Sequence, residues 1–180
     1  MSKNVLIISS SARKGGNSDT LCDRFAAGAS DAGHAVEKVR LAEKNIGCCR
    51  GCYACSKTGV CVQGDDMGEL LEKMEAADVI VLASPVYFYT VCGRLKNFID
   101  RTLPRYPFKD WAGKHWYFIL AAAENDREAM RHAVGDFMGY MENMTDPVVK
   151  EPIYGVGAWN VGDVHALPSM DEAYQAGLHS

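Results

Sequence analysis

The chain has 180 residues, of which 48% are hydrophobic and 23% are charged, and this composition excludes extended disorder and predicts a single domain over residues 1–180. The net charge of −4 excludes a broad basic surface, so we expect no nucleic-acid partner. The apolar runs are far shorter than the ~20 residues of a membrane-spanning helix, and the first residues carry no signal-peptide cleavage pattern, so we expect a cytoplasmic protein without a membrane partner.

Five short segments have the composition of β-strands. Three of them are continuous apolar runs, as expected for strands that are buried on both faces, and they lie at residues 5–8, 78–83 and 116–120. Residues 36–41 are more polar and predict a more exposed strand. Residues 148–156 contain the fifth candidate strand.

Between these strands the apolar residues recur at the three- and four-residue spacing of a helix face. We interpret each stripe as a helix that packs on the core. The stripes are Leu21, Phe25 and Ala29; Met67, Leu70, Leu71 and Met74; Leu95, Phe98 and Ile99; Met130, Ala133, Val134, Phe137, Met138 and Met141; and Met170, Ala173 and Tyr174.

The alternation of strands and helices predicts an α/β fold with a doubly wound parallel sheet and helices on both faces. Five strands favour the flavodoxin-like order 2-1-3-4-5 over a six-stranded dinucleotide-binding sheet. In such sheets a ligand binds beyond the carboxyl ends of the strands, where the strand order reverses. We therefore expect the function to depend on the segments that follow residues 8, 83 and 120.

The first of these segments, residues 9–18, has the composition of an anion-binding loop, because it reads SSSARKGGNS between a buried strand and a helix. Hydroxyl groups, free backbone N–H groups and a helix N-terminus bind anions together, and Arg13 adds a planar donor for phosphate oxygens. The loop is neither a Walker loop nor a GxGxxG loop, which favours a mononucleotide over a dinucleotide. The alternative is that these residues serve only in a turn and a helix cap. The predicted binding residues are Ser9, Ser11, Arg13, Gly16, Asn17 and Ser18.

The second segment, residues 84–90, places three consecutive aromatic residues at the mouth of the sheet. Backbone amides there can hold the edge of a planar heterocycle, and an aromatic ring can cover its face. A subunit interface is an alternative that is compatible with the first, and we expect a homodimer or a dimer of dimers. The third segment, residues 121–126, suits either a flat ligand or a tight turn into a helix. The predicted binding residues of the second segment are Pro85, Val86, Tyr87, Phe88 and Tyr89.

A phosphate-binding loop beside a surface for a flat heterocycle indicates flavin mononucleotide (FMN). Residues 9–18 resemble the GSPRKxGNT loop of the NAD(P)H-dependent FMN reductases, and residues 84–87 with the LKNFIDR run at 95–101 resemble their SPVY…LKxFIDR segment. The cysteine stretch that ends at Cys61 is similar to the iron–sulfur flavoprotein branch of that family. Ser10 and Ala12 stand where the family usually has Gly and Pro, and alanines at 121–123 replace a glycine-rich turn.

Five of the seven cysteines fall in a cysteine-rich loop that we place at residues 47–64. Three cysteines separated by two residues each, with a fourth nearby, can converge on a 4Fe–4S cluster. Thiolates also bind zinc, although zinc sites usually pair two separate CxxC motifs. Related flavoproteins keep a similar loop without a cluster, so a cluster, free thiols and zinc all stay open here. The predicted ligands are Cys49, Cys52, Cys55 and Cys61, whereas Cys48 is not expected to be one.

These observations predict a flavin-dependent oxidoreductase that binds FMN and transfers electrons from NAD(P)H to a flavin, a quinone or another small-molecule or protein acceptor. The cofactor carries the chemistry, so we predict no catalytic side chain. The five histidines are scattered without metal-binding spacing. Two alternatives remain, namely a non-enzymatic iron–sulfur flavoprotein that carries electrons between proteins and a redox-sensing protein that uses its cysteines as a switch.

Overall fold

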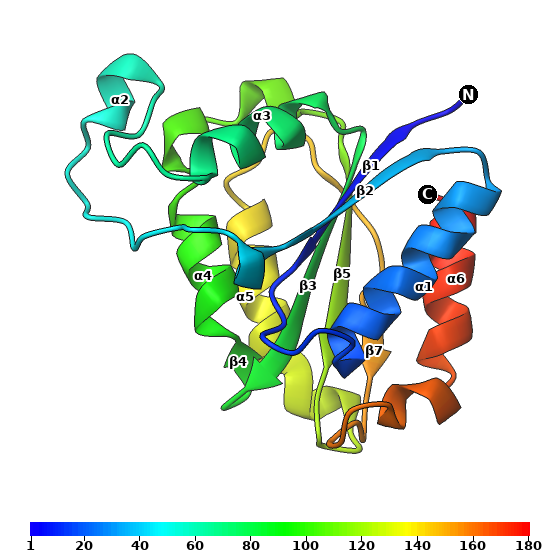
Figure 1. Cartoon of the computed structure of the whole chain (residues 1–180). Helices are drawn as coiled ribbons and strands as arrows, with labels where there is room; N and C mark the ends of the chain where they lie inside the picture. Colours follow the sequence, from blue (N-terminus) through cyan, green and yellow to red (C-terminus); the bar gives the residue numbers. More distant parts are fainter.

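The computed structural model describes residues 1–180, and its centre is a parallel β-sheet (Figure 1). Its four long strands are β1 (Asn4–Ser9), β2 (Ala35–Arg40), β3 (Val79–Tyr87) and β5 (His115–Ala121). They run parallel in the order β2-β1-β3-β5. The apolar runs that predicted β1, β3 and β5 are buried along nearly their whole length, whereas β2 is the more exposed edge strand, as its polar composition predicts.

The fifth position of the sheet is divided between two short strands, β6 (Val148–Val149) and β7 (Ile153–Gly155), which both pair in parallel with β5. The segment 148–156, which was predicted to contain the fifth strand, therefore contains two short strands instead of one. Pro152 precedes β7, and proline has no N–H group to donate to a sheet ladder, which explains the interruption. A further strand, β4 (Thr90–Val91), forms an antiparallel hairpin with β3. The sheet thus has seven strands instead of five, but the predicted α/β fold and the order 2-1-3-4-5 of its parallel positions are confirmed.

Six α-helices and five short 3-10 helices connect the strands. The α-helices are α1 (Asn17–Asp31), α2 (Cys55–Thr58), α3 (Met67–Ala76), α4 (Gly93–Asp100), α5 (Arg131–Met141) and α6 (Ser169–Leu178). The 3-10 helices are η1 (Leu41–Glu43), η2 (Leu103–Arg105), η3 (Lys109–Trp111), η4 (Arg127–Met130) and η5 (Asp163–Ala166). Each predicted apolar stripe lies on one of the α-helices, except that Met130 belongs to η4, and α2 is the only α-helix without a stripe. None of the helices has the length and apolar character needed to cross a membrane.

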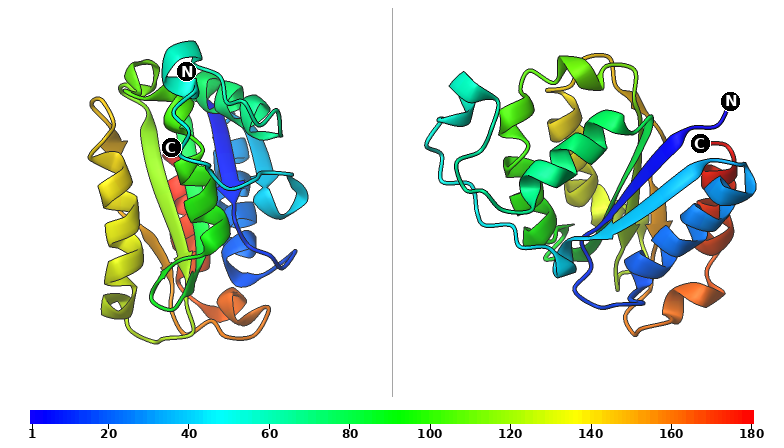
Figure 2. Two further views of the ribbon diagram at one scale, coloured as in Figure 1. Left: turned by 90° about the vertical axis from the view of Figure 1, so that its left-hand side faces the viewer. Right: turned by 45° about the horizontal axis from the view of Figure 1, so that its top comes forward.

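The helices form a layer on each face of the sheet (Figures 1 and 2). Helices α1 and α6 pack on the face that carries Ile7, Val81 and Ile119, whereas α3, α4 and α5 cover the face that carries Ile8 and Phe118. Neighbouring residues of one strand point to opposite faces, so a continuous apolar strand supplies both cores at once. This sandwich holds the carboxyl ends of the strands in fixed positions along one edge of the sheet.

Two glycines allow α1 and α6 to pack closely. A Cβ atom built on Gly28 of α1 would lie 2.0 Å from the carbonyl oxygen of Tyr174, and one built on Gly177 of α6 would lie 2.1 Å from that of Phe25. Any side chain at either position would therefore push the two helices apart.

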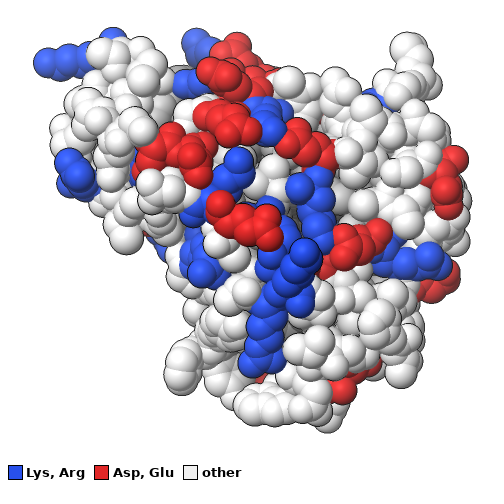
Figure 3. All heavy atoms as spheres, viewed as in Figure 1, with Lys and Arg blue, Asp and Glu red and all other residues white.

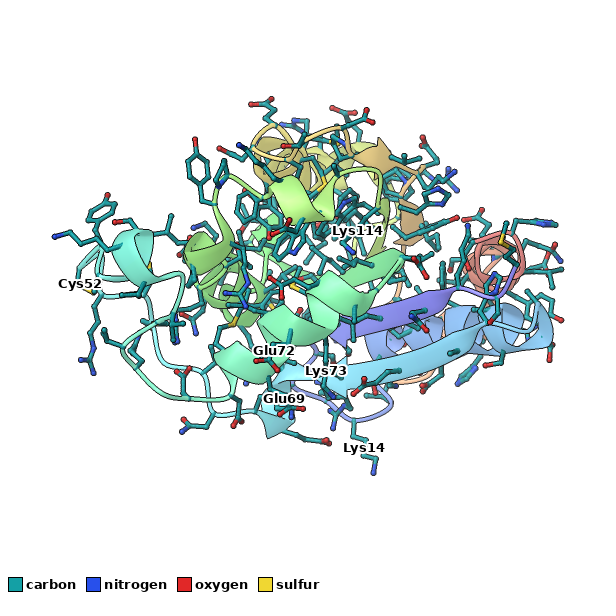
Figure 4. All side chains as sticks on the ribbon, turned by 90° about the horizontal axis from the view of Figure 1, so that it is seen from above. Lys14, Cys52, Glu69, Glu72, Lys73 and Lys114 are labelled. Atoms are coloured by element: carbon teal, nitrogen blue, oxygen red, sulfur yellow. The ribbon has the colours of Figure 1, made fainter.

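Charged side chains of both signs alternate over the surface near β2 (Figure 3). On α3, Lys73 lies beside Glu69 (Figure 4), with which it forms an ion pair at 3.0 Å, and it also pairs with Glu37 of β2. Lys44 pairs with Glu69 at 3.4 Å. Positive and negative side chains are therefore paired along this exposed edge of the sheet, and neither sign of charge dominates there.

Candidate active site

A cavity of about 240 Å³ lies at the carboxyl edge of the sheet, where the segments after β1, β3 and β5 meet. The residue pairs Ser9–Ala83 and Pro85–Ala121 are in register across this edge, which brings the three loops together. The cavity is lined by Ser11, Arg13, Gly16, Asn17, Ser18, Pro85, Val86, Tyr87, Ala121, Ala122, Ala123, Ala158 and Trp159. It contains eight of the eleven predicted cofactor-binding residues, and the exceptions are Ser9, Phe88 and Tyr89.

The loop after β1 is folded by its own hydrogen bonds into a cradle. The Ser11 hydroxyl accepts a bond from the Arg13 N–H and donates one to the Arg13 carbonyl oxygen. Gly15 has φ of 66°, a left-handed conformation that suits glycine. A Cβ atom on Gly16 would lie 3.0 Å from the Ser11 hydroxyl oxygen and 3.1 Å from the Arg13 carbonyl oxygen, so the cradle has no room for a side chain there.

A buried carboxylate, that of Asp19, stabilises this cradle through hydrogen bonds. It accepts hydrogen bonds from the Ser9 hydroxyl at 2.7 Å and from the Gly15 N–H at 3.0 Å, and Lys38 of β2 lies 3.2 Å away. Burial raises the pKa of Asp19, but the bonds from Ser9 and Gly15 and the charge of Lys38 outweigh burial and hold the pKa below its ordinary value. Ser9 therefore points to Asp19 and not into the cavity. The sequence reasoning missed Asp19, whose only signal was an acidic residue in the first turn of a helix.

Asn17 organises a second loop above the cavity. Its side-chain amide donates to the carbonyl oxygens of Ala158 and Asn160, and its Oδ1 accepts from the N–H groups of Gly162 and Val164. These bonds place Trp159, which is 74% exposed, at the rim of the cavity. Trp159 was not predicted, because it lies in a segment without helix or strand periodicity.

The groups that face the cavity fit a phosphate. Helix α1 begins there without a side-chain cap, and the N–H groups of Asn17 and Ser18 have no acceptor within the chain. The hydroxyl of Ser18 and the guanidinium of Arg13 likewise form no hydrogen bond within the chain, although both residues line the cavity. Free helix N–H groups with a nearby guanidinium are the donors that a phosphate group requires.

The opposite wall of the cavity fits a flat and largely apolar group. Pro85, Val86 and Tyr87 come from the end of β3, and the small residues 121–123 come from the end of β5. The sequence motif at 121–123 lacks the glycines that are usual in the resembled family, yet its alanines still line the cavity. Tyr87 also lines a neighbouring cavity, beside α4.

Phe88 and Tyr89 occupy the turn of the β3–β4 hairpin and do not line the cavity. Both have positive φ, at 50° and 66°, a conformation that costs bulky residues about 1–2 kcal/mol each. Phe88 is 98% exposed and Tyr89 is 52% exposed. This hairpin therefore displays two aromatic rings on the outside of the molecule, next to the cavity.

The four predicted metal ligands line a separate cavity of about 20 Å³ in the cysteine-rich loop, which projects with α2 beyond the sheet (Figure 1). Cys52 lies at the outer end of this projection (Figure 4). Burial raises the pKa of the Cys55 thiol, and the other three sulfurs, when ionised, raise it further. No group of three or more His, Cys, Asp or Glu side chains is arranged to hold a metal ion. The two cavities share no residue.

A buried ion pair ties the cysteine-rich loop to the sheet domain. Arg101, at the end of α4, donates to both oxygens of Asp65 at 2.7 Å, to the Gly47 carbonyl oxygen at 2.7 Å and to Cys61 Sγ at 3.4 Å. Asp65 in turn accepts from the N–H groups of Gly47 and Met67. The hydrogen bonds from Arg101 lower the pKa of Asp65 to about 2, so the carboxylate stays ionised. The pair therefore clamps both ends of the loop.

Comparison with known proteins agrees with this geometry. A family model described as NADPH-dependent FMN reductase matches residues 3–159. An iron–sulfur flavoprotein of Archaeoglobus fulgidus is 45% identical over 94 residues, which cover 52% of this chain and 43% of that protein. An iron–sulfur flavoprotein of Methanocaldococcus jannaschii is 40% identical over 100 residues, which cover 56% of this chain and 52% of that protein. The chain thus spans about half the length of the curated relatives it matches.

Two solved structures share the fold. The NAD(P)H:quinone oxidoreductase of Methanothermobacter marburgensis superposes with a TM-score of 0.76 at 17% identity, covering 99% of this chain and 97% of that one. An FMN-dependent NADH-azoreductase of Bacillus anthracis superposes with a TM-score of 0.72 at 13% identity, covering 98% of each chain. At these identities the likeness concerns the fold alone. The family model, however, matches most of the chain and includes both walls of the cavity, and the chain therefore belongs to the NADPH-dependent FMN reductase family.

Proposed function

We propose that the protein is an FMN-dependent oxidoreductase that takes electrons from NAD(P)H and passes them to a flavin, a quinone or another acceptor. The observation that carries this proposal is the cavity at the sheet edge. One side of it offers hydrogen-bond donors that have no partner within the chain and suit a phosphate, and the other side is a flat apolar wall. Membership of the FMN reductase family supports the same ligand. The location, which we predict to be cytoplasmic, would keep the cysteines reduced.

The residues of this chain would bind and orient the flavin. Arg13, Ser18 and the free N–H groups of α1 would hold the phosphate, and residues 85–87 would contact the ring system, with Trp159 at the rim. Asp19 and Asn17 would keep the two loops in place without touching the cofactor through their side chains. Bound FMN supplies the redox chemistry, since it accepts a hydride from a reduced nicotinamide and also exchanges single electrons.

The cavity beside α4 supports a dinucleotide donor. It measures about 370 Å³, shares Tyr87 with the FMN cavity, and is lined by Lys44 and Arg94 but by no acidic residue. Arg94 forms no ion pair, and Lys44 is only partly neutralised by Glu69 at 3.4 Å, so the phosphates of NAD(P)H are the anionic groups that these two cations attract. We expect Lys44→Gln or Arg94→Gln to raise the KM for NADPH by about tenfold with little change in kcat. Lys96→Gln, on an exposed part of the same helix, is the control and should leave the KM unchanged.

The direct test of the proposed function is to identify the bound flavin and to measure whether the protein oxidises NADPH. Flavin released by heat from the purified protein should run as FMN on chromatography, and FAD as the bound species would contradict the proposal. The protein should then oxidise NADPH when free flavin or a quinone is the acceptor. A protein that binds FMN and a cluster but oxidises no NADPH would instead be an electron carrier.

We also propose that the cysteine-rich loop binds a 4Fe–4S cluster. Four thiols around one cavity are the donor set of such a cluster, and relatives that are 40–45% identical carry the name iron–sulfur flavoprotein. Because the sulfurs are not yet arranged around a metal, cluster binding requires the loop to draw them together.

Anaerobic reconstitution followed by iron and sulfide analysis tests the cluster. We expect about four irons per chain, and Cys→Ala substitution at position 49, 52, 55 or 61 should remove most of the iron and leave FMN bound. Cys22→Ala is the control, because Cys22 is a buried residue of α1 and lies far along the chain from the loop. Iron-free protein, with single variants that behave like the unmodified chain, would contradict the cluster and favour free thiols or a cysteine-based redox sensor.

A further inference from the structure

Arg101 is the most deeply buried cation in the molecule. Only 2% of the residue is exposed, although an arginine carries five N–H donors that require partners. Its Nη atoms are fully used by Asp65, Gly47 and Cys61, as described above, whereas its Nε is buried without any hydrogen-bond partner. Arg101 Nε is one of six buried side-chain atoms without a partner, so the Nη contacts, and not Nε, show what this buried cation serves.

The surroundings of Arg101 show which groups its charge acts on. Arg101 lines the same cavity as Cys49, Cys52, Cys55 and Cys61. The other charged residues of that cavity are Arg50, which is exposed, and Asp100, which forms an ion pair with Lys96. Arg101 is therefore the one buried charge next to the sulfurs, and its Nη2 is 3.4 Å from Cys61 Sγ.

Asp65 limits but does not cancel this charge. Its carboxylate lies on the Nη side of the guanidinium together with the Gly47 carbonyl oxygen, and it is held there by three hydrogen-bond donors besides Arg101 Nη2. The pair thus forms a fixed dipole in which the guanidinium, and not the carboxylate, contacts a sulfur. A charge in a buried position is screened little by salt, so the field of this dipole at the cavity depends little on ionic strength.

We propose that Arg101 is a positioning residue that holds Cys61 as a cluster ligand through a charged N–H···S hydrogen bond and raises the reduction potential of the cluster. The proposal rests on the proposed cluster in the cysteine-rich loop. Adding one electron makes an iron–sulfur cluster more negative, so a nearby positive charge and hydrogen bonds to the sulfurs stabilise the reduced state. Removing the positive charge should lower the potential, and removing the negative charge of Asp65 should raise it.

The experiment compares midpoint potentials of the reconstituted protein, followed by the electron paramagnetic resonance signal of the reduced cluster. We expect Arg101→Gln to shift the equilibrium between the two oxidation states about tenfold toward the oxidised state, which is about 59 mV for one electron. Asp65→Asn should shift it in the opposite direction. Arg101→Lys, which keeps the charge but lacks the planar fork, should lie between the unmodified protein and Arg101→Gln.

Arg105→Gln is the matched control. Arg105 lies four residues after Arg101, in η2, donates to the Gly59 carbonyl oxygen of the same loop at 2.7 Å and pairs with Glu75. It lines a cavity with Cys61 but forms no hydrogen bond to a sulfur. Its replacement loosens the loop and removes a cation paired with Glu75, but it removes no hydrogen bond to a sulfur, so the potential should shift far less than in Arg101→Gln.

The outcomes separate the inference from the proposed cluster. Opposite shifts for Arg101→Gln and Asp65→Asn support the inference, because a merely structural role of the ion pair would move both potentials the same way. Equal shifts, or no shift beyond that of Arg105→Gln, would overturn it while leaving the cluster in place. If Arg101→Gln fails to fold, Arg101→Lys and Asp65→Asn still carry the comparison. Absence of iron from the unmodified protein would overturn the proposed cluster and this inference together.

Discussion

Among single residues, Arg13 has the clearest role in the proposed binding of FMN. Its guanidinium lines the cavity and has no partner within the chain, so a phosphate would be its first strong contact. We expect Arg13→Ala to weaken FMN binding by about 1.5–3 kcal/mol, the value of a hydrogen bond to a charged group, in a fluorescence titration of the apoprotein.

The neighbouring lysine provides the control for this prediction. Lys14 is exposed, does not line the cavity and points away from the molecule (Figure 4). Lys14→Ala should therefore leave FMN affinity nearly unchanged. Equal losses for the two variants would show that Arg13 contributes only general positive charge.

Asp65 is a single residue whose contribution to the free energy of unfolding depends on pH. The bonds from Arg101 lower its pKa to about 2 in the folded protein, below the ordinary value of 3.8. A lowered pKa means that the carboxylate stabilises the fold above pH ~4, where it is ionised in both states, and that this contribution is lost as the pH falls toward 2. We expect Asp65→Asn to lower the free energy of unfolding at pH 7 and to lose most of that effect near pH 2.5. Denaturant unfolding at the two pH values measures it, and a difference that does not shrink with acid would contradict the ion pair.

At the scale of whole elements, the contact between α1 and α6 depends on Gly28 and Gly177. A Cβ atom at either position would meet backbone at about 2 Å, and backbone cannot move aside as the end of a side chain can. We expect Gly28→Ala or Gly177→Ala to lower the free energy of unfolding by at least ~1–3 kcal/mol, as overpacked cores do. Thermal unfolding of the purified variants tests this.

The control for the helix contact is Gly135 of α5, which has open space around its Cβ position. Alanine is a better helix former than glycine by about 0.8–1 kcal/mol, so Gly135→Ala should raise the unfolding temperature or leave it unchanged. Destabilisation by Gly135→Ala would mean that helix glycines in this protein act through something other than packing space.

For the molecule as a whole, we propose that it forms a homodimer, or a dimer of dimers, through the β3–β4 hairpin. Tyr87, Phe88 and Tyr89 present aromatic surface to solvent beside the FMN cavity, and such surface usually marks an interface. The hairpin also keeps two bulky residues at positive φ, a cost that a buried partner surface would offset. Light scattering at micromolar concentration should give at least twice the mass of one chain.

Phe88→Asn distinguishes an interface from a merely exposed turn. Asparagine tolerates positive φ better than phenylalanine does, so the hairpin itself should become no less stable while the aromatic contact is lost. We expect the variant to be a monomer that retains its helical circular dichroism. An unchanged assembly, or a monomeric unmodified protein, would contradict the proposed interface.

The sequence by itself determined the layers of the fold and the position of the cavity. Continuous apolar runs such as residues 79–83 suit only strands that are covered on both faces, and the helical stripes between them supply the two covers. The loop after β1 could be identified because its order of hydroxyl, basic and glycine residues has a local physical meaning next to a strand end and a helix start. These features depend on neighbours in the chain, which a sequence pattern records.

Only the tertiary structure decided which polar side chains serve the ligand and which serve the fold. Asn17 bonds to residues more than 140 positions away, and Arg101 reaches Asp65 across 36 positions. Ser9 turns to the buried Asp19, and Trp159 reaches the cavity from a segment without periodicity. A pattern along the chain indicates whether a residue is buried or exposed and which local structure it prefers. The partner of a polar group is set by where distant segments meet, and that is determined when the sheet and its helices pack.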